Sequence, residues 1–266
     1  SADNASGGRP ARYTMQAMTI HLIYIDVRTG FYPGAHHGLA ALCAAVSAAG
    51  HRWRLTHVTR PFNPESLAAR LAADDADVYG LSAMTHAFRH VRTLAPRLAV
   101  ASGRPVLLGG VHATLAPAEA AAVEGVACCC QGDGDAFLPA WLDAWATGGD
   151  WRAVPGAWYR QGRGIEHTPP ACTPDLADLP VPDYSGFDMP RIIRDLGGRM
   201  SLVVSRGCPF GCTFCCNEAL RRAYPARSRY VRVLPPAEAV RRAGELARRY
   251  KAESVRFEDD LLLLRP

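Results

Sequence analysis

The apolar run TIHLIYID, residues 19–26, reads as a buried β-strand, and the residues after it repeat a strand–helix rhythm. GLAALCAAVSAAG (38–50) has helical periodicity and ends at Gly50, and RWRLTHV (52–58) alternates as a strand does. The rhythm then predicts a helix from Asn63–Pro64, a strand over 76–82, a helix over 86–101, a strand over 105–110, a helix from Pro117, a strand over 126–130 and a helix over 135–147. This alternation predicts an α/β fold in which helices cover both faces of a doubly wound parallel sheet.

The composition indicates a soluble chain of about two domains. Its 266 residues contain no signal-peptide pattern and no apolar run long enough to span a membrane, so we expect a cytoplasmic location. Nine cysteines, an odd number, favour metal binding or catalysis over disulfides. The net charge is +5, and residues 191–251 carry much of the arginine. That excess could suit an anionic partner, but Glu238 and Glu245 precede arginine pairs as on a solvated helix face, and no nucleic-acid motif is present.

The chain divides into four parts by composition. Residues 1–18 are small and polar and are expected to form a flexible leader, and residues 19–150 carry the strand–helix series. Residues 151–197 begin with a predicted hairpin, AWYR and IEHT around the turn QGRG, and continue as a Pro- and Asp-rich linker. Residues 198–266 start a second series that ends before a barrel of such units could close, so we expect a truncated, partial TIM barrel. Its predicted elements are strand MSLVVS (200–205), a helix over 235–250 and strand SVRFE (254–258).

Four cysteines lie within nine positions in SRGCPFGCTFCC, residues 205–216. Cys208, Cys212 and Cys215 have the spacing C-x3-C-x2-C and follow a predicted strand, where the functional loops of parallel β/α folds lie. Three thiolates can hold three irons of a four-iron cluster and leave the fourth iron open to a ligand. The alternatives are a zinc site that uses Cys216 as a fourth ligand, or plain buried thiols. Adjacent cysteines seldom ligate one tetrahedral metal, so Cys216 is expected to be a bystander or a pocket wall.

This cysteine stretch resembles the signature of the radical S-adenosylmethionine (SAM) enzymes, including the aromatic Phe214 before the last cysteine. The resemblance implies a 4Fe-4S cluster on Cys208, Cys212 and Cys215. It also implies that the open iron chelates the amino and carboxylate groups of SAM. Phe214 is expected to shield the cluster and to belong to the SAM site.

The acidic stretch FEDD, residues 257–260, ends the next predicted strand. Polar residues at that end of a barrel strand are typical of a functional site. The stretch resembles an F-x-D-D pattern that lies near SAM in the cobalamin-type radical enzymes. By that resemblance Glu258, Asp259 and Asp260 would receive the amino or ribose groups of SAM; the alternative is a solvated acidic loop or a helix cap.

Small residues mark the carboxyl ends of the strands in residues 19–150, where doubly wound sheets bind ligands. The segments are GLSAMT (80–85), LLGGVHAT (107–114) and CQGDGDAFLPAWL (130–142). Together with the cysteine motif and the linker LADLPVPDY (176–184), they resemble the Rossmann-like cobalamin-binding domain and connector of one radical SAM subfamily. The resemblance implies that the nucleotide tail of cobalamin enters between the strands and that the corrin ring lies at the rim; the alternative is a Rossmann-like domain that is empty or differently occupied. The cobalamin-binding residues so implied are Ser82, Thr85, Gly109, Gly110, His112, Thr114 and Gly132.

The sequence departs from the D-x-H-x-x-G loop of corrinoid carriers. That loop would begin at Asp26, but Arg28 stands at the histidine position and no glycine occupies position 31. We therefore expect no axial imidazole from this loop. His36 and His37 could replace it; otherwise they are solvent-exposed or helix-start histidines.

The other cysteines are expected to have no ligand role. Cys128, Cys129 and Cys130 are consecutive in a strand, so their side chains alternate between faces and are expected in the core. Cys43 on an apolar helix is likewise expected in the core, and Cys172 in the linker has no visible partner.

These features predict a cobalamin-dependent radical SAM enzyme, with a methyltransferase favoured. It would act on an unactivated carbon or phosphorus centre through a 5′-deoxyadenosyl radical and methylcobalamin. One alternative is a cyclase or rearrangement enzyme with the same cofactors and no net methylation, and another is a non-enzymatic corrinoid-binding fragment. The resemblance implies a small-molecule or peptide substrate, which the sequence does not identify, and an electron donor such as flavodoxin or ferredoxin.

Overall fold

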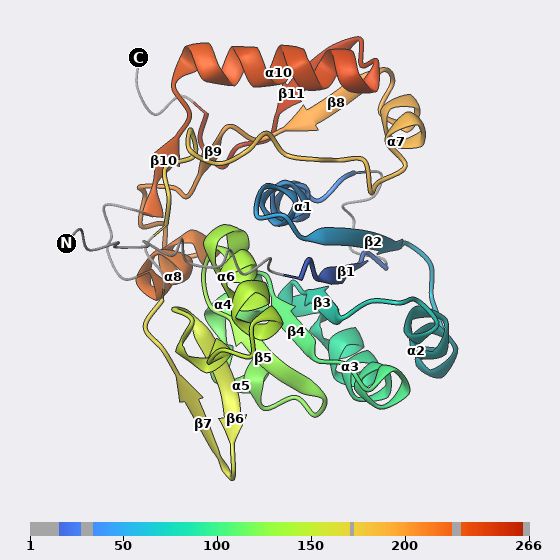
Figure 1. The fold of residues 1–266 in the computed structure, drawn as a ribbon. Helices are drawn as coiled ribbons and strands as arrows, with labels where there is room; N and C mark the ends of the chain where they lie inside the picture. The colour runs from blue at the N-terminus through green and yellow to red at the C-terminus, as the bar shows by residue number, and fades with distance from the viewer. Residues whose placement is uncertain (1–15, 28–33, 171–172, 225–229, 263–266) are drawn as a thin grey trace, which may run out of the picture.

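The computed structural model describes residues 16–27, 34–170, 173–224 and 230–262. Its centre is a seven-stranded sheet with the order β2-β1-β3-β4-β5-β6-β7 (Figure 1). The strands are β1 Thr19–Ile25, β2 Arg52–Val58, β3 Val78–Ser82, β4 Val106–Gly109, β5 Val126–Cys130, β6 Ala157–Gln161 and β7 Gly164–His167. β1 to β5 pair in parallel, which confirms the α/β, doubly wound prediction. The strand order reverses between β1 and β3, and a sheet of this kind opens a crevice at such a point.

Four predicted features lie wholly or partly outside the described residues. They are most of the leader, the loop positions 28 and 31, Cys172 and the end of the last apolar run.

Helices cover both faces of the sheet and bury two apolar cores (Figure 1). α1 (His37–Ala48) and α6 (Gly134–Ala146) contribute to the first core, and α2 (Pro64–Ala72), α3 (Phe88–Ser102) and α5 (Pro117–Ala121) contribute to the second. Within β1, Ile20 and Leu22 belong to the first core, whereas Ile23 and Ile25 belong to the second. All seven residues of β1 are therefore buried, because helices cover both faces of the strand.

Local signals explain several element boundaries. The side chain of Asn63 accepts a hydrogen bond from the backbone N–H of Ser66, with Pro64 at the first helical position, so α2 begins as predicted. The long helix predicted from Pro117 is only five residues, and a second short helix, α4 (Val111–Leu115), precedes it. The predicted hairpin forms, and β6 pairs antiparallel with β5, so the hairpin extends the main sheet instead of standing in the linker.

A second unit follows the linker and the short helix α7 (Met189–Asp195). In it β8 (Arg199–Leu202) pairs in parallel with β11 (Ser254–Phe257). β9 (Ser205–Arg206) pairs antiparallel with β10 (Arg232–Val233), and the helices are α8 (Cys216–Ala223) and α10 (Pro236–Tyr250). The predicted single strand over 200–205 is therefore wrong. The strand divides where Oδ1 of Asp259 accepts hydrogen bonds from the backbone N–H groups of Val204 and Ser205.

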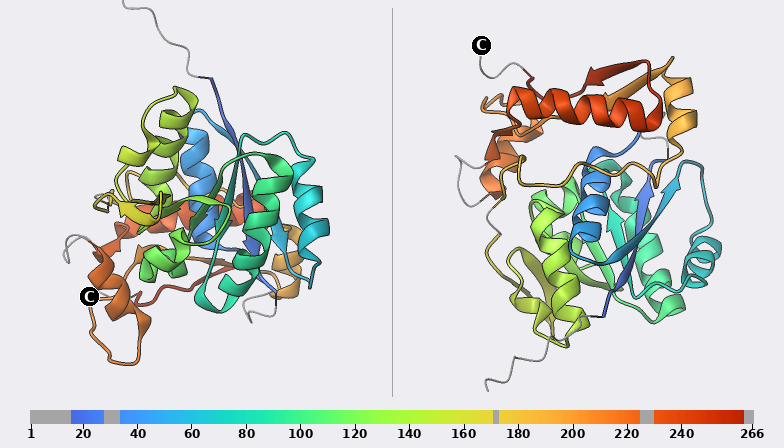
Figure 2. Two further views of the ribbon diagram at one scale, coloured as in Figure 1. Left: turned by 90° about the horizontal axis from the view of Figure 1, so that it is seen from below. Right: turned by 45° about the horizontal axis from the view of Figure 1, so that its top comes forward.

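The second unit packs on the α1 side of the sheet (Figure 2). Leu246 of α10 and Met200 of β8 are buried in the first core together with side chains of α1 and α6. Tyr184 of the linker, 1% exposed, connects the layers: its hydroxyl lies 2.8 Å from Nδ1 of His37, and its backbone N–H donates to the hydroxyl of Tyr250. One continuous apolar core therefore joins the sheet to the second unit.

The predicted core positions of the structural cysteines are confirmed. Cys43, Cys128 and Cys129 are fully buried, and Cys130 nearly so. On α10, Glu238 and Glu245 each form ion pairs with two arginines, but the solvated face is confirmed only in part. Arg242 is buried and donates to two carbonyl groups of the linker. In the part of the chain that the structure describes, none of the helices combines the length and the hydropathy needed to cross a bilayer.

The packing of α6 gives a stability prediction. Leu142 of α6 is 0% exposed, so Leu142→Ala should lower the free energy of unfolding by about 2–5 kcal/mol through lost burial and the cavity that remains. Val100→Ala on α3, where Val100 is 86% exposed, is the matched control and should change the free energy by about 0.5 kcal/mol or less. Urea unfolding followed by circular dichroism measures both. Equal losses in the two variants would contradict the packing of α6.

Candidate functional site

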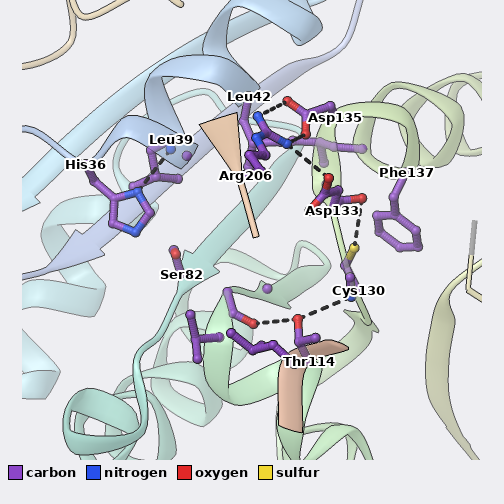
Figure 3. A pocket seen from close by; sticks show the side chains of 18 of the residues that line it. His36, Leu39, Leu42, Ser82, Thr114, Cys130, Asp133, Asp135, Phe137 and Arg206 are labelled. Carbon is purple, nitrogen blue, oxygen red and sulfur yellow. Dashed lines mark hydrogen bonds and ion pairs between the residues drawn. The ribbon is translucent and has the colours of Figure 1, made fainter. Parts of the chain in front are cut away.

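A cavity of about 490 Å³ lies at the carboxyl ends of the central strands (Figure 3). Its walls come from β1, β3, β4, α1 and α6 on one side and from residues of the second unit on the other. Ile20, Leu107 and Leu138 form part of an apolar lining. Of the residues predicted to bind cobalamin, the cavity is lined by Ser82, Gly109, Gly110, Thr114 and Gly132.

Gly109 and Gly110 at the cavity are glycine for different physical reasons. A Cβ on Gly110 would lie 2.8 Å from the carbonyl oxygen of Ala83, and the φ of Gly110 is +94°, so this position requires glycine. At Gly109 no atom lies within 4 Å of an added Cβ, so the absence of a side chain leaves open space. Thr114 fixes the neighbouring turns, since its hydroxyl donates to the carbonyl of Gly110 and accepts from the N–H of Gly132 at 3.2 Å.

Thr85 and His112 do not line the cavity. The ring of His112 stacks on Phe88 with centroids 3.7 Å apart, and its Nδ1 lies 3.4 Å from the hydroxyl of Thr85. Burial lowers the pKa of His112. The structure thus places His112 in the packing of α4 against Phe88 of α3, with the exposed Thr85 beside it, and neither side chain reaches the cavity.

His36 lines the cavity and caps α1 (Figure 3). Its Nδ1 accepts a hydrogen bond from the backbone N–H of Leu39 at 3.1 Å. Burial, and then the neighbouring His37, lower the pKa of His36 to about 4, so the ring is neutral at pH 7 and carries its proton on Nε2. A metal ligand needs a lone pair, whereas this Nε2 is a donor. The geometry therefore supports the helix-start role and not cobalt ligation by His36.

The three motif cysteines lie on one loop but do not form a complete metal site. Cys208, Cys212 and Cys215 are free thiols, and Cys212 is exposed. Within the residues that the structure describes, no three His, Cys, Asp or Glu side chains come close enough together to hold a metal ion. The donor set nevertheless suits an iron–sulfur cluster, because three soft thiols stand on one short loop. Gly207 before the loop has φ +80°, and a Cβ there would lie 2.5 Å from the carbonyl oxygen of Tyr230.

Two expectations for this loop differ from the structure. Phe214 is 92% exposed, so it shields none of the cysteines in this conformation. Cys216 is exposed at the start of α8 and does not line the cavity, so it forms no wall of this pocket.

The acidic stretch after β11 also lines the cavity, and each carboxylate has a partner in the second unit. Oδ1 of Asp259 accepts from the N–H and hydroxyl of Ser205, whereas its buried Oδ2 has no hydrogen-bond partner among the described residues. Asp260 accepts from the side-chain amide of Asn217 at 3.1 Å. Glu258 accepts from the hydroxyl of Ser201, and its carboxylate lies 3.8 Å from Nε2 of His37. The nearby imidazole is the main cause that lowers the pKa of Glu258 to about 2. Oδ1 of Asp259 thus fixes the backbone of Val204 and Ser205, and its Oδ2 is an acceptor with no partner among the described residues.

Sequence reasoning missed an ion-pair network in the cavity wall. Asp133 and Asp135, at the start of α6, pair with Arg206 of β9, and Asp133 also pairs with Arg232 of β10 (Figure 3). The available signal was the pair of acidic residues in CQGDGDAF, a segment interpreted for its glycines. The network joins the sheet domain to residues on both sides of the cysteine loop.

The fold and the cavity define an α/β ligand-binding domain joined to the start of a second β/α unit, and comparisons identify its relatives. Residues 25–142 match the family model of the B12 binding domain. The chain is 27% identical over 151 residues to the uncharacterized methyltransferase PH0819 of Pyrococcus horikoshii, covering 54% of this chain and 32% of the relative. It is 30% identical over 138 residues to the hopanoid C-3 methylase of Methylococcus capsulatus, covering 52% and 24%.

Solved structures extend the similarity to most of the chain. The radical SAM methyltransferase TsrM from Kitasatospora setae, with tryptophan substrate and a SAM analogue bound, matches with a TM-score of 0.74 and 19% identity, covering 92% of this chain and 48% of TsrM. The cobalamin-dependent SAM radical enzyme OxsB, with aqua-cobalamin and SAM bound, matches with a TM-score of 0.71 and 16% identity, covering 92% and 34%. The chain spans about a third or less of its curated relatives and about half or less of these enzymes. The resemblance drawn from the motifs is confirmed: residues 25–142 match the B12 binding domain, and the chain has the fold of the matching part of cobalamin-dependent radical SAM enzymes.

The two adjacent glycines of the cavity give a paired prediction. Gly110→Ala should lower the free energy of unfolding by about 1–3 kcal/mol through its positive φ and extended ψ alone, and further through overlap with Ala83. Gly109→Ala should change it little, because the added methyl group meets open space. Chemical denaturation of both variants measures the difference, and a tolerated Gly110→Ala would contradict the close approach of β3 and β4.

The lowered pKa of His36 predicts a pH dependence. Between its ordinary value of 6.5 and about 4, the unfolded chain binds a proton at this residue that the folded chain does not. Its contribution therefore destabilises the fold as the pH falls from about 6.5 to 4. His36→Asn keeps a capping side chain, so the loss of stability between pH 7 and pH 5 should be smaller than in the wild type.

Urea midpoints at the two pH values measure this change. A wild-type dependence in His36→Asn would show that the ring is not held neutral.

Proposed function

We propose that this chain is the cobalamin-binding part and the first barrel segment of a cobalamin-dependent radical SAM methyltransferase. The observation that carries the proposal is the cavity, because its walls combine the strand ends of the B12-binding domain with residues next to the cysteine motif. Two curated relatives with methyltransferase or methylase names, and the fold shared with TsrM, support methyl transfer. The reaction would methylate an unactivated carbon or phosphorus centre.

The residues of the cavity suit the nucleotide tail of a corrinoid. The space beside Gly109 and Gly132 admits a bulky group between α1 and α6, and the apolar side chains around it exclude water. Ser82 and Thr114 offer hydroxyl groups in the wall. When bound, cobalamin carries a transferable methyl group, and a reduced 4Fe-4S cluster supplies the electron that cleaves SAM. The protein then provides orientation and a dry environment.

The second unit would hold the other two cofactors. Cys208, Cys212 and Cys215 supply the thiolates for the cluster. The free Oδ2 of Asp259, with Glu258 and Asp260 nearby in the cavity wall, would accept hydrogen bonds from amino or ribose groups of SAM. Phe214 would reach this site by a change of the loop.

The proposed organisation follows from these roles. It comprises a leader over 1–18, the cobalamin-binding domain over 19–150, a hairpin and linker over 151–197 and the start of a TIM-type radical SAM barrel over 198–266. We place the enzyme in the cytoplasm with a flavodoxin- or ferredoxin-type electron donor and a small-molecule or peptide substrate.

A second candidate reaction uses the same cofactors without net methylation. Its support is the fold shared with OxsB, whose name specifies a cobalamin-dependent SAM radical enzyme and no methyl transfer. A product heavier by one methyl group would favour the methyltransferase, and consumed substrate without that gain would favour cyclisation or rearrangement.

Cofactor loading tests the proposal directly. After anaerobic reconstitution with iron, sulfide and cobalamin, we expect about four irons and one corrinoid per chain. A Cys208/Cys212/Cys215→Ala variant should lose the iron and keep the corrinoid, because the cysteines would hold the cluster whereas the strand ends of the sheet would hold the corrinoid. Corrinoid without iron in the wild type would favour a corrinoid-binding fragment, and a wild type without corrinoid would contradict the proposal.

A further inference from the structure

One carboxylate in the cavity wall holds residues on both sides of the cysteine segment. Oδ2 of Asp133 accepts hydrogen bonds from Nη1 of Arg206 at 3.1 Å and from Nη2 of Arg232 at 2.5 Å, and its Oδ1 accepts from the hydroxyl of Tyr224 at 2.6 Å. Arg206 stands two residues before Cys208, and Tyr224 directly follows α8. The segment made of the cysteine loop and α8 is therefore flanked by two groups that Asp133 fixes.

Asp135 sets the orientation of the first anchor. Its two oxygens accept from Nη1 and Nη2 of Arg206, at 2.5 and 3.1 Å, and its side chain is 4% exposed. A bidentate pair of this kind fixes the plane of the guanidinium group as well as its position. Figure 3 shows both aspartates facing Arg206 from the start of α6.

The charges of this network balance, and each group needs the others. Burial by itself raises the pKa of Asp133, but Arg206 and Arg232 outweigh burial and hold that pKa below its ordinary value. Asp133 is therefore ionised at neutral pH. Removing its charge leaves Arg206 paired with Asp135 alone and Arg232 without an ion-pair partner among the described residues, which is strongly unfavourable in a mostly buried site.

The same residues form part of the cavity surface. Asp133, Asp135, Arg206 and Arg232 all line the cavity, as does Gly207 at the start of the cysteine loop. The side chain of Arg232 is 6% exposed, and its Nε has no hydrogen-bond partner among the described residues. A molecule that fills the cavity therefore contacts the network that anchors the loop.

We propose that Asp133 and Asp135 are positioning residues that set the conformation of the cysteine loop, and that a corrinoid in the cavity tightens this conformation through them. The inference rests on the proposed function, since it takes the occupant of the cavity to be a corrinoid. The cobalamin-binding domain would then regulate how the cluster ligands are presented.

Alkylation of the thiols measures the loop without requiring the cluster. The cluster-free 266-residue chain is treated with N-ethylmaleimide in the dark, with and without methylcobalamin, and mass spectrometry follows each cysteine. In the wild type, methylcobalamin should slow the alkylation of Cys208, Cys212 and Cys215 severalfold. In Asp133→Asn the three rates should rise severalfold and lose their response to methylcobalamin.

The chain contains its own controls for misfolding. The buried Cys43, Cys128 and Cys129 should stay protected in every variant that keeps the fold. Asp143→Asn is the matched control on α6, because Asp143 pairs with His51 and lies outside the cavity wall, and it should behave as the wild type does. If Asp133→Asn exposes the core thiols and so fails to fold, Tyr224→Phe tests the positioning role instead. This variant removes one hydrogen bond to Asp133 and no charge.

Each result bears on a separate claim. Tyr224→Phe should show part of the rise in alkylation at the three motif cysteines. The positioning role would be overturned if a folded Asp133→Asn variant kept the wild-type alkylation rates and the wild-type response to methylcobalamin. If Asp133→Asn does not fold, the same result in Tyr224→Phe would overturn it. Methylcobalamin that binds the wild type without slowing alkylation would overturn the coupling alone. A wild type that does not bind methylcobalamin would overturn the proposed function and this inference with it.

Discussion

The need to neutralise buried charge at Asp133 governs how the two units of this protein fit together. A carboxylate away from water is stable only with close cationic partners and hydrogen-bond donors. Arg206 and Arg232 come from β9 and β10, so the requirement is met only when the second unit lies against the start of α6. Apolar contacts do not depend on direction, so they alone would allow several orientations of the second unit. The hydrogen-bonded ion pairs depend on distance and angle. The network thus selects one docked arrangement among those that apolar burial alone would allow.

The cavity is a product of this arrangement and of small residues at the strand ends. Gly110 lets β4 turn close to the backbone of β3, and Gly109 leaves the space that a side chain would fill. α1 and α6 form the sides, and Asp259 closes part of the far wall while it divides β8 from β9. A site built from so many elements depends on the whole fold and not on one loop.

Much of the fold could be predicted because the signals for its strands and helices lie within short stretches of sequence. The both-faces-buried pattern of β1, the alternating faces of Cys128, Cys129 and Cys130, and the cap at Asn63 are each visible within a few residues. The contacts between Asp133 and Arg206 span 73 positions, and no local pattern gives such a pairing. The same limit explains His112, which lies in an expected segment but stacks on Phe88, and Thr85, whose hydroxyl faces His112. It also explains the division of the strand over 200–205 by a distant aspartate. Residue type and spacing identified the candidate ligands, and the tertiary structure decided which of them meet.

The shared walls of the cavity have a consequence for the lifetime of the protein. A molecule that fills the cavity touches both units at once, so its binding energy also holds them together. Stability then rises with the logarithm of free ligand concentration once that concentration exceeds the dissociation constant. Proteases that cut transiently opened chains would degrade the empty protein faster than the filled one. The amount of this protein in a cell would therefore follow the supply of its ligand without any change in synthesis.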